Sequence, residues 1–215
     1  MQRPSYLAQE DPLDALCHHY NVRRVRHTDT STPTTLDMPV LSDSNLPTHV
    51  FAISQQDSAS SSHIIVPFDI TMYEKGFRVG INSPSDPDAT PPKTHKTEDS
   101  NEVITLPVVP LAVPHAASIP LLLLFGLGLE TQPNTLASRL LPPHVIEEFP
   151  NAAAMAQVLS QLGDDLFNRV VRYNKGIWAN VLALGLRDTQ IMGLVQTAWN
   201  VTAEARRTKQ QWPGR

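Results

Sequence analysis

The chain has 215 residues, which is enough for one domain with flanking segments. Its 19 prolines outnumber its 9 glycines, and hydrophobic residues make up 41% of it, which indicates a folded part interrupted by proline-rich irregular segments. The net charge of −4 excludes a nucleic-acid binder that relies on bulk positive charge, and the single cysteine excludes an internal disulfide.

Residues 1–46 are rich in Ser, Thr, Asp and Pro around one basic patch, Val22–His27. So little apolar surface cannot offset the entropy of ordering, and we expect a mostly disordered tail with at most a short helix over Leu13–Tyr20. The segment resembles neither a secretory signal nor a transit peptide. We therefore expect a soluble, intracellular protein.

Strand signals begin at Thr48, with HVFAIS and then HIIVPFDITMYEKGFRVGI over residues 63–81. Phe77, Val79 and Ile81 alternate with other residues, the pattern of a half-buried strand. We expect a hairpin turn at 74–76, with Gly76 at positive φ. Pro67 indicates that the first arm is an edge strand or begins after that residue.

Residues 83–102 contain acids and prolines and no large apolar residue, which predicts a long loop. The segment VITLPVVPLAV, residues 103–113, returns to β-type residues. Its prolines at 107 and 110, with Pro114 just after it, argue against a regular central strand.

The run IPLLLLFGLGLE, residues 119–130, is too short for a transmembrane helix and lacks the third glycine of a dinucleotide loop. Pro120 suits a first helical turn, and Gly126 and Gly128 suit a helix end. We predict a buried central helix.

Four amphipathic helices are predicted after it. Asn151 caps one that ends before Gly163, and Asp164 caps a second that extends to Tyr173. A third spans residues 176–185, and Asp188 precedes the longest. The expected fold class is α+β: a small β-layer packed on a C-terminal array of short amphipathic helices, in one domain over 47–210 with its helical half at 118–210.

Several residues are candidates for regulation or partner binding. Trp178 and Trp199 lie on amphipathic helices; such residues are usually core, but tryptophan is also enriched at binding hot spots. Two basic patches are candidate nuclear-import signals: Arg23, Arg24 and Arg26, and Arg206, Arg207 and Lys209. Thr32, Ser83 and Thr90 precede prolines and are candidate phosphorylation sites.

No catalytic or metal-binding signature is found in the sequence. Cys17, His18, His19 and His27 form a cluster, but no second ligand pair matches it, so a polar helix face is the preferred interpretation. There is no nucleophile elbow of the GxSxG type. We expect no catalytic residue, no cofactor and no metal.

Two segments of the helical half carry a family resemblance: SRLLPPHVIEEFPNAAAMAQVLSQ, and YNKGIWANVLALGLRDTQIMGLVQTAWNVTAEARR. Over about residues 103–209 the chain resembles the clampless protein family of mushroom-forming and related fungi. The resemblance implies a non-enzymatic nuclear regulator of sexual development, required for clamp cells and dikaryon growth downstream of the mating-type homeodomain factors. It implies partners among regulatory proteins such as transcription factors, and it carries over no functional residue.

The order of elements is also similar to that of BTB/POZ domains, which dimerise or recruit partners. Three hypotheses follow. The first is a developmental regulator that acts through protein–protein interaction, without direct nucleic-acid or membrane binding. The second is a BTB/POZ-like dimerisation or adaptor domain. The third is an enzyme of unrecognised type, which would need a pocket where Cys17, His115 or His144 meets a carboxylate.

Overall fold

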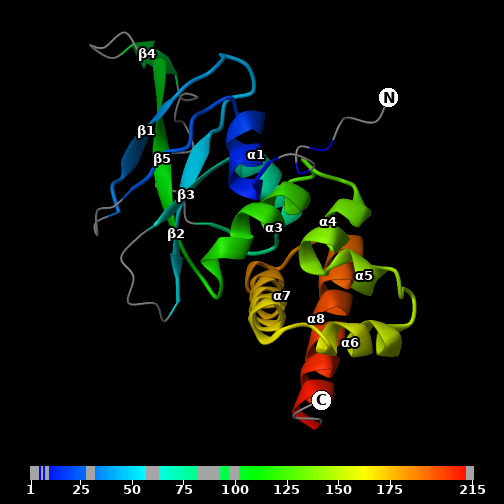
Figure 1. Ribbon diagram of the computed structural model, residues 1–215. Helices are drawn as coiled ribbons and strands as arrows, with labels where there is room; N and C mark the ends of the chain where they lie inside the picture. The colour runs from blue at the N-terminus through cyan, green and yellow to red at the C-terminus, as the bar shows by residue number, and fades with distance from the viewer. Residues whose placement is uncertain are drawn as a thin grey trace.

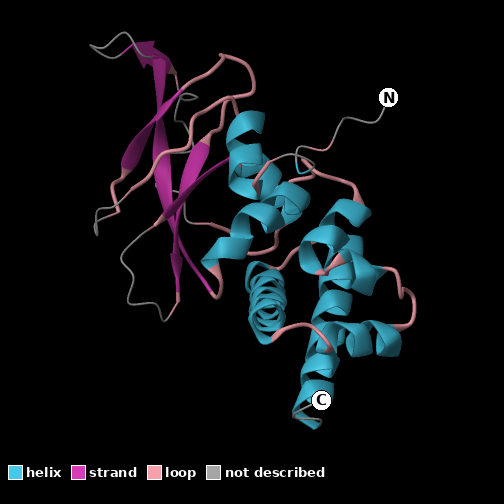
Figure 2. Ribbon diagram, viewed as in Figure 1, coloured by secondary structure: helices cyan, strands magenta, loops and turns pink. Residues whose placement is uncertain are grey.

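The computed structural model describes Ser5, Leu7 and residues 10–27, 32–56, 63–81, 93–96 and 102–211. It is a mixed α+β fold in which a twisted sheet lies at one end and a group of helices at the other (Figures 1 and 2). The general expectation of a β-layer followed by a helical array is confirmed.

The sheet has strands β1 (Thr35–Pro39), β2 (His49–Gln55), β3 (Ile64–Phe68), β4 (Thr94–Lys96) and β5 (Glu102–Val113). Its order is β1-β5-β2-β3, and β4 pairs with the start of β5. β2 and β5 run parallel, and the other pairs are antiparallel. Pro67 lies in β3, an edge strand, as predicted. β4 lies inside the segment 83–102 that was expected to be loop.

β5 is a central strand, so the expectation that its prolines exclude one is wrong. The Val108 N–H donates to the Thr34 carbonyl oxygen at 2.9 Å. Val108 therefore faces β1, and because backbone groups two residues apart face the same edge of a strand, the Pro110 nitrogen faces that side too. It lies beyond the last residue that pairs with β1, so no N–H donor is needed there. The Pro107 nitrogen faces the other edge, between the residues of β5 that pair with β4 and those that pair with β2.

The segment after β3 forms a helix, α2 (Ile70–Gly76), and the predicted hairpin at 74–76 is wrong. Asp69 caps the helix by accepting the Met72 N–H at 2.9 Å. Gly76 does not make a turn; a Cβ atom there would lie 1.9 Å from the carbonyl oxygen of Gly126. Gly76 is therefore required by the close approach of two helix ends.

Helix α1 (Pro12–His19) and strand β1 lie in the segment expected to be a disordered tail. That expectation is wrong for the described residues of 10–27 and 32–46. Leu13 and Leu16 are buried against the rest of the core, and α1 packs on the central helix and on β3. The Tyr20 hydroxyl accepts the Asp69 N–H at 3.1 Å. The few apolar residues of this segment suffice because they pack on apolar surface that α3 and β3 supply.

Helix α3 (Ile119–Gly126) is the predicted buried helix, entered through the short 3-10 helix η2 (Ala116–Ser118). The exposed fraction of each side chain from Leu121 to Leu124 is at most 1%. Figure 1 shows α3 between the sheet and the helices that follow it. α3 thus joins the two halves of the molecule in one core.

The helical half continues with α4 (Pro133–Leu140), α5 (Pro143–Ile146), α6 (Ala152–Ser160), α7 (Asp164–Leu184) and α8 (Thr189–Gln211). Asn151 caps α6, and the Asp188 carboxylate accepts the N–H groups of Gln190 and Ile191, as predicted. α7 is a single helix that passes through Gly176, so the expected break there is wrong. None of the helices in the described ranges is long and apolar enough to cross a membrane.

Candidate partner-binding site

Helices α7 and α8 form an antiparallel pair at the end of the molecule away from the sheet (Figure 1). Asn174, which is fully buried, fixes their register. Its side-chain N–H groups donate to the Thr202 hydroxyl and to the Leu140 carbonyl oxygen, both at 3.0 Å. The same residue therefore attaches α7 to α8 and to the end of α4.

Trp178 and Trp199 lie on the same side of this pair. Trp178 follows Asn174 by four residues, and Trp199 precedes Thr202 by three. The helices are antiparallel and turn by about 100° per residue, so both displacements lead to the same level and the same side of the pair. Both tryptophans are half-buried, and Trp178 packs against the core.

Further apolar side chains continue this surface, which we call the tryptophan face: Val171, Trp178 and Leu182 on α7, and Met192 and Trp199 on α8. All five are partly or largely exposed. Leu182, one turn beyond Trp178, has an exposed fraction of 61%. Helices α4 and α6 also pack on α8, and the side chains of the tryptophan face still stay partly or largely open to solvent.

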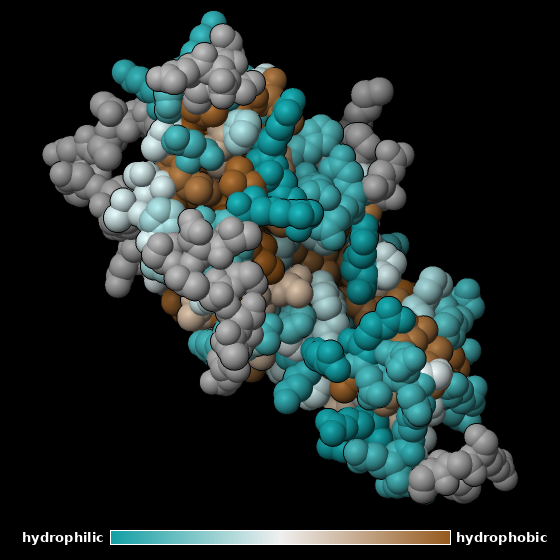
Figure 3. Space-filling view, turned by 60° about the vertical axis from the view of Figure 1, so that its left-hand side comes forward, coloured by the Kyte–Doolittle hydropathy of each residue, from teal (hydrophilic) through white to brown (hydrophobic). Residues whose placement is uncertain are grey.

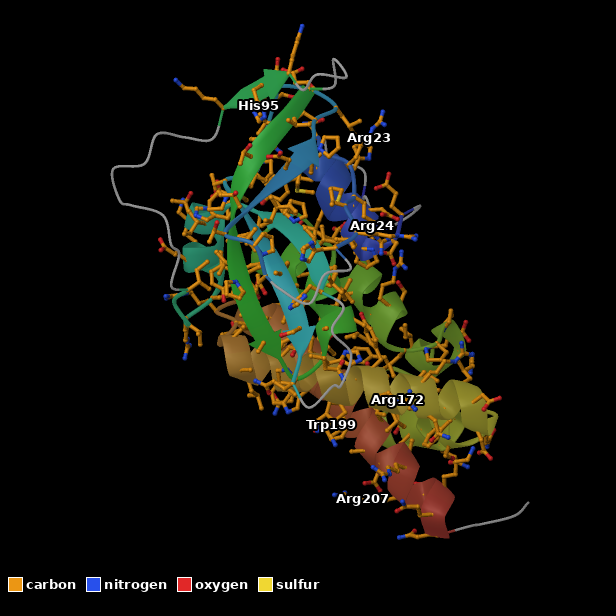
Figure 4. All side chains as sticks on the ribbon, turned by 90° about the vertical axis from the view of Figure 1, so that its left-hand side faces the viewer. Arg23, Arg24, His95, Arg172, Trp199 and Arg207 are labelled. Atoms are coloured by element: carbon orange, nitrogen blue, oxygen red, sulfur yellow. The ribbon has the colours of Figure 1, made fainter. Side chains whose placement is uncertain are left out.

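Basic residues border the tryptophan face on its C-terminal α8 side. Arg206 and Arg207 are exposed, as is Lys175 on α7. Trp199 and Arg207 lie on the same side of the α8 ribbon in Figure 4. The Arg207 guanidinium pairs with Glu204 at 3.0 Å, but both groups are largely exposed, so solvent screens the pair. On the face that Figure 3 shows, hydrophilic residues predominate at the helical end, with smaller hydrophobic areas between them.

Lys209, predicted with Arg206 and Arg207 as one basic patch, has a structural position. Its ammonium group lies 2.8 Å from the Asp164 carboxylate and donates to the Leu162 carbonyl oxygen at 2.6 Å. It also lies 4.8 Å from the centre of the Phe167 ring. These contacts fasten the end of α8 to the start of α7, so only Arg206 and Arg207 of this patch project freely.

The second basic patch lies far from the first. Arg23, Arg24 and Arg26 are exposed, and Arg24 pairs with Asp14 at 3.4 Å. Figure 4 shows Arg23 and Arg24 toward the opposite end of the molecule from Arg207. The two patches therefore form two separate surfaces.

Of the candidate phosphorylation sites, Thr32 is exposed. Ser83 and Thr90 lie outside the residues that the structure describes.

The residues weighed for catalysis or metal binding are dispersed. Burial raises the pKa of the Cys17 thiol to about 12, so it stays protonated at neutral pH. His18 lies at the surface with its Nδ1 2.9 Å from Glu10, and His144 is exposed on α5. His115 contacts the Ser118 hydroxyl at 3.0 Å rather than a carboxylate. In the described ranges no three His, Cys, Asp or Glu side chains lie close enough to hold a metal ion.

One pocket was not anticipated from the sequence. It has a volume of about 370 Å³ and lies between α4, α7 and η2, with three arginines in its lining: Arg139, Arg169 and Arg172. The spacing of Arg169 and Arg172 on α7 places them on neighbouring turns of one helix surface. Only the fold brings Arg139 to them.

Comparisons of the chain with protein-family models, with curated proteins and with solved structures give no significant match.

Proposed function

We propose that this protein is a non-enzymatic regulator that binds an acidic amphipathic helix of a partner protein on its tryptophan face. In keeping with the family resemblance of residues 103–209, the partner would be a regulatory protein of fungal sexual development, such as a transcription factor of the mating-type pathway. The observation that carries the proposal is the pair of half-buried tryptophans on the open side of α7 and α8.

The apolar part of the proposal rests on burial. Trp178 and Trp199 are anchored by the helix pair while part of each ring is open to solvent, as is most of Leu182 (61%). A partner helix that covers them would bury large rigid rings at a small cost in side-chain entropy. Tryptophans held in this way are common binding hot spots.

The charge expected of the partner follows from the basic residues that border the tryptophan face, which we call its rim. Lys175, Arg206 and Arg207 border the tryptophan face, and only Arg207 has an ion-pair partner within the described ranges. An acidic helix would complement this rim and be steered toward it. A basic helix would meet like charge. The occupant is therefore an apolar helix face flanked by Asp or Glu.

A direct test uses a fluorescein-labelled peptide that carries Leu or Phe at helical i, i+3, i+4 and i+7 positions and Glu elsewhere. Its anisotropy is titrated with the full chain. We expect saturable binding, about tenfold weaker for Trp199→Ala, which removes a hot-spot ring. Leu182→Ala should also weaken binding. Leu41→Ala is the matched control, since Leu41 is similarly exposed (55%) but lies outside the tryptophan face.

Two outcomes would contradict the proposal. One is equal affinity for a peptide in which every Glu is replaced by Lys, which would remove the electrostatic argument. The other is equal loss of affinity in Leu41→Ala and Leu182→Ala. If sedimentation instead shows a dimer that Leu182→Ala weakens, the tryptophan face would be a self-association surface, as the BTB/POZ-like alternative predicts.

The developmental part is tested in a fungus that forms clamp cells. Deletion should abolish clamps, and the wild-type chain and Leu41→Ala should restore them, whereas Trp199→Ala should not. Normal clamps in the deletion strain would refute the role. Nuclear accumulation is tested in the same strain with Arg206→Ala/Arg207→Ala and with Arg23→Ala/Arg24→Ala/Arg26→Ala. If neither triple nor double variant lowers nuclear signal, the basic patches are not import signals.

A further inference from the structure

The arginine pocket lies on another side of α7 from the tryptophan face. Arg169, Arg172 and Tyr173 line it from α7, Arg139 from the last turn of α4, and His115 from the residue before η2. Its volume is about 370 Å³. Three arginines from two helices thus line one space.

Within the part of the chain that the structure describes, these cations lack carboxylate partners. In the described ranges no ion pair includes Arg139, Arg169 or Arg172. Arg139 donates through one terminal nitrogen to the carbonyl oxygens of Leu7 and Glu10, at 2.5 and 3.0 Å. Those bonds orient its guanidinium without neutralising its charge. The Asp11 carboxylate, whose charge contributes to raising the pKa of Tyr173, already accepts the Leu13 N–H as the cap of α1.

Neutral donors complete the lining. Burial raises the pKa of the Tyr173 hydroxyl to about 12, so it keeps its proton. Burial and the charge of Arg172 lower the pKa of His115, which keeps its ring neutral near pH 7. The His115 ring is fixed by the Ser118 hydroxyl at 3.0 Å. The positive charge of the pocket therefore comes from the arginines alone.

We propose that this pocket binds the phosphate group of a phosphorylated side chain in a protein segment. Guanidinium forks match phosphate oxygens in geometry and charge, and clusters of arginine are a recurrent means of recognising phosphorylated peptides. The rest of the lining, Leu140, Leu166 and Val170 among it, is apolar and provides a wall for a neighbouring apolar residue.

A free nucleotide fits this lining less well. No Asp, Glu, Asn, Gln, Ser or Thr is among the described residues that line the pocket. Ribose hydroxyls and base edges are usually recognised by such groups. The segment bound is accordingly a peptide with an apolar residue next to its phosphorylated one.

The test uses immobilised degenerate peptide libraries with one fixed central phosphoserine, phosphothreonine or phosphotyrosine, and the same libraries without phosphate. The full chain should retain a phosphorylated pool at least about tenfold better than its unphosphorylated counterpart, since each charged hydrogen bond contributes severalfold to affinity. Arg169→Gln/Arg172→Gln should abolish the difference. Both arginines are exposed, so this variant should fold normally.

Arg23→Gln/Arg26→Gln is the control for bulk charge, because it removes two exposed arginines from the segment after α1, outside both the arginine pocket and the tryptophan face. It should leave the preference for phosphate unchanged. An equal loss in this control, or no preference in any library, would overturn the proposal. Tighter binding of ATP than of every phosphorylated pool would assign the pocket to a nucleotide and overturn the peptide assignment. None of these outcomes bears on the tryptophan face.

Discussion

Replacing glycine with alanine should lower the stability of the protein at Gly176 and raise it at Gly193, although both glycines lie in long helices. Gly176 lies within α7, and a Cβ atom there would lie 2.3 Å from Cγ and 2.6 Å from Cβ of His115. Gly193 lies within α8, where a Cβ atom would have no neighbour within 4 Å. From helix propensity alone, alanine is favoured over glycine by about 1 kcal/mol at each position.

The surroundings of His115 decide whether Gly176→Ala raises or lowers the stability of the protein. The Asn180 side chain donates to the His115 carbonyl oxygen at 2.7 Å and accepts its N–H at 3.2 Å. The histidine backbone is therefore held on both sides, and its Cβ and Cγ cannot move away easily. Overpacking of this kind costs about 3 kcal/mol at the upper end of its range. After the gain in propensity, Gly176→Ala should lose about 2 kcal/mol.

Thermal unfolding followed by circular dichroism gives the measurement. In a chain of this length each kcal/mol corresponds to about 2–4 °C in Tm, so Gly176→Ala should melt about 4–8 °C lower. Gly193→Ala should melt about 2–4 °C higher. If both variants gain stability, the contact of α7 with His115 is wrong, and with it the junction between the helical half and η2.

Three other predictions concern the core. Leu123→Asn places an unpaired amide in α3 and should cost about 4 kcal/mol, seen as a lower urea midpoint; normal stability would refute the central position of α3. Pro110→Ala should leave the stability nearly unchanged, whereas Val108→Pro should lower it by about 3 kcal/mol, because the Val108 N–H donates to the Thr34 carbonyl oxygen. Similar urea midpoints for the two variants would contradict the register of β5. Burial raises the pKa of Cys17 from 9.0 to about 12, so its contribution to stability is complete below pH 9 and is lost as the pH rises toward 12. Urea titrations from pH 8 to 11 should show that the free energy of unfolding falls less steeply with pH in Cys17→Ala than in the wild type. An equally steep fall in both would refute this linkage.

Local signals in the sequence suffice for much of the helical half. Asn151 and Asp188 cap their helices through hydrogen bonds to N–H groups two or three residues ahead, so the start of each helix depends on adjacent residues alone. The apolar run at α3 has no polar face, and Pro120 and Gly126 mark its ends. Such features need no knowledge of the partner surface.

Elements whose order depends on distant residues were mispredicted. α1 is stabilised by burial against α3 and β3, segments far away in the sequence. The apparent strand at 77–81 follows from alternating residue types, yet Phe77 is buried and Val79 is 45% exposed, and the chain before them forms α2. Gly176 looked like a helix break because its packing partner, His115, is 61 residues earlier.

The candidate sites divide in the same way. Trp178, Trp199 and the basic residues of α8 could be selected from the sequence, because residue type and helical spacing single them out. Their common side of the helix pair depends on the register that Asn174 and Thr202 set. The arginine pocket could not be predicted from the sequence, since Arg139 and Arg169 are brought together only by the packing of α4 on α7. The sequence by itself determined the caps at Asn151 and Asp188, the buried helix and the residue types of the surface, because these depend on near neighbours. It misplaced one cap: α7 begins at Asp164, and Gly163 precedes it without a side-chain cap. Only the tertiary structure decided which distant side chains share one surface, because that depends on how the elements pack.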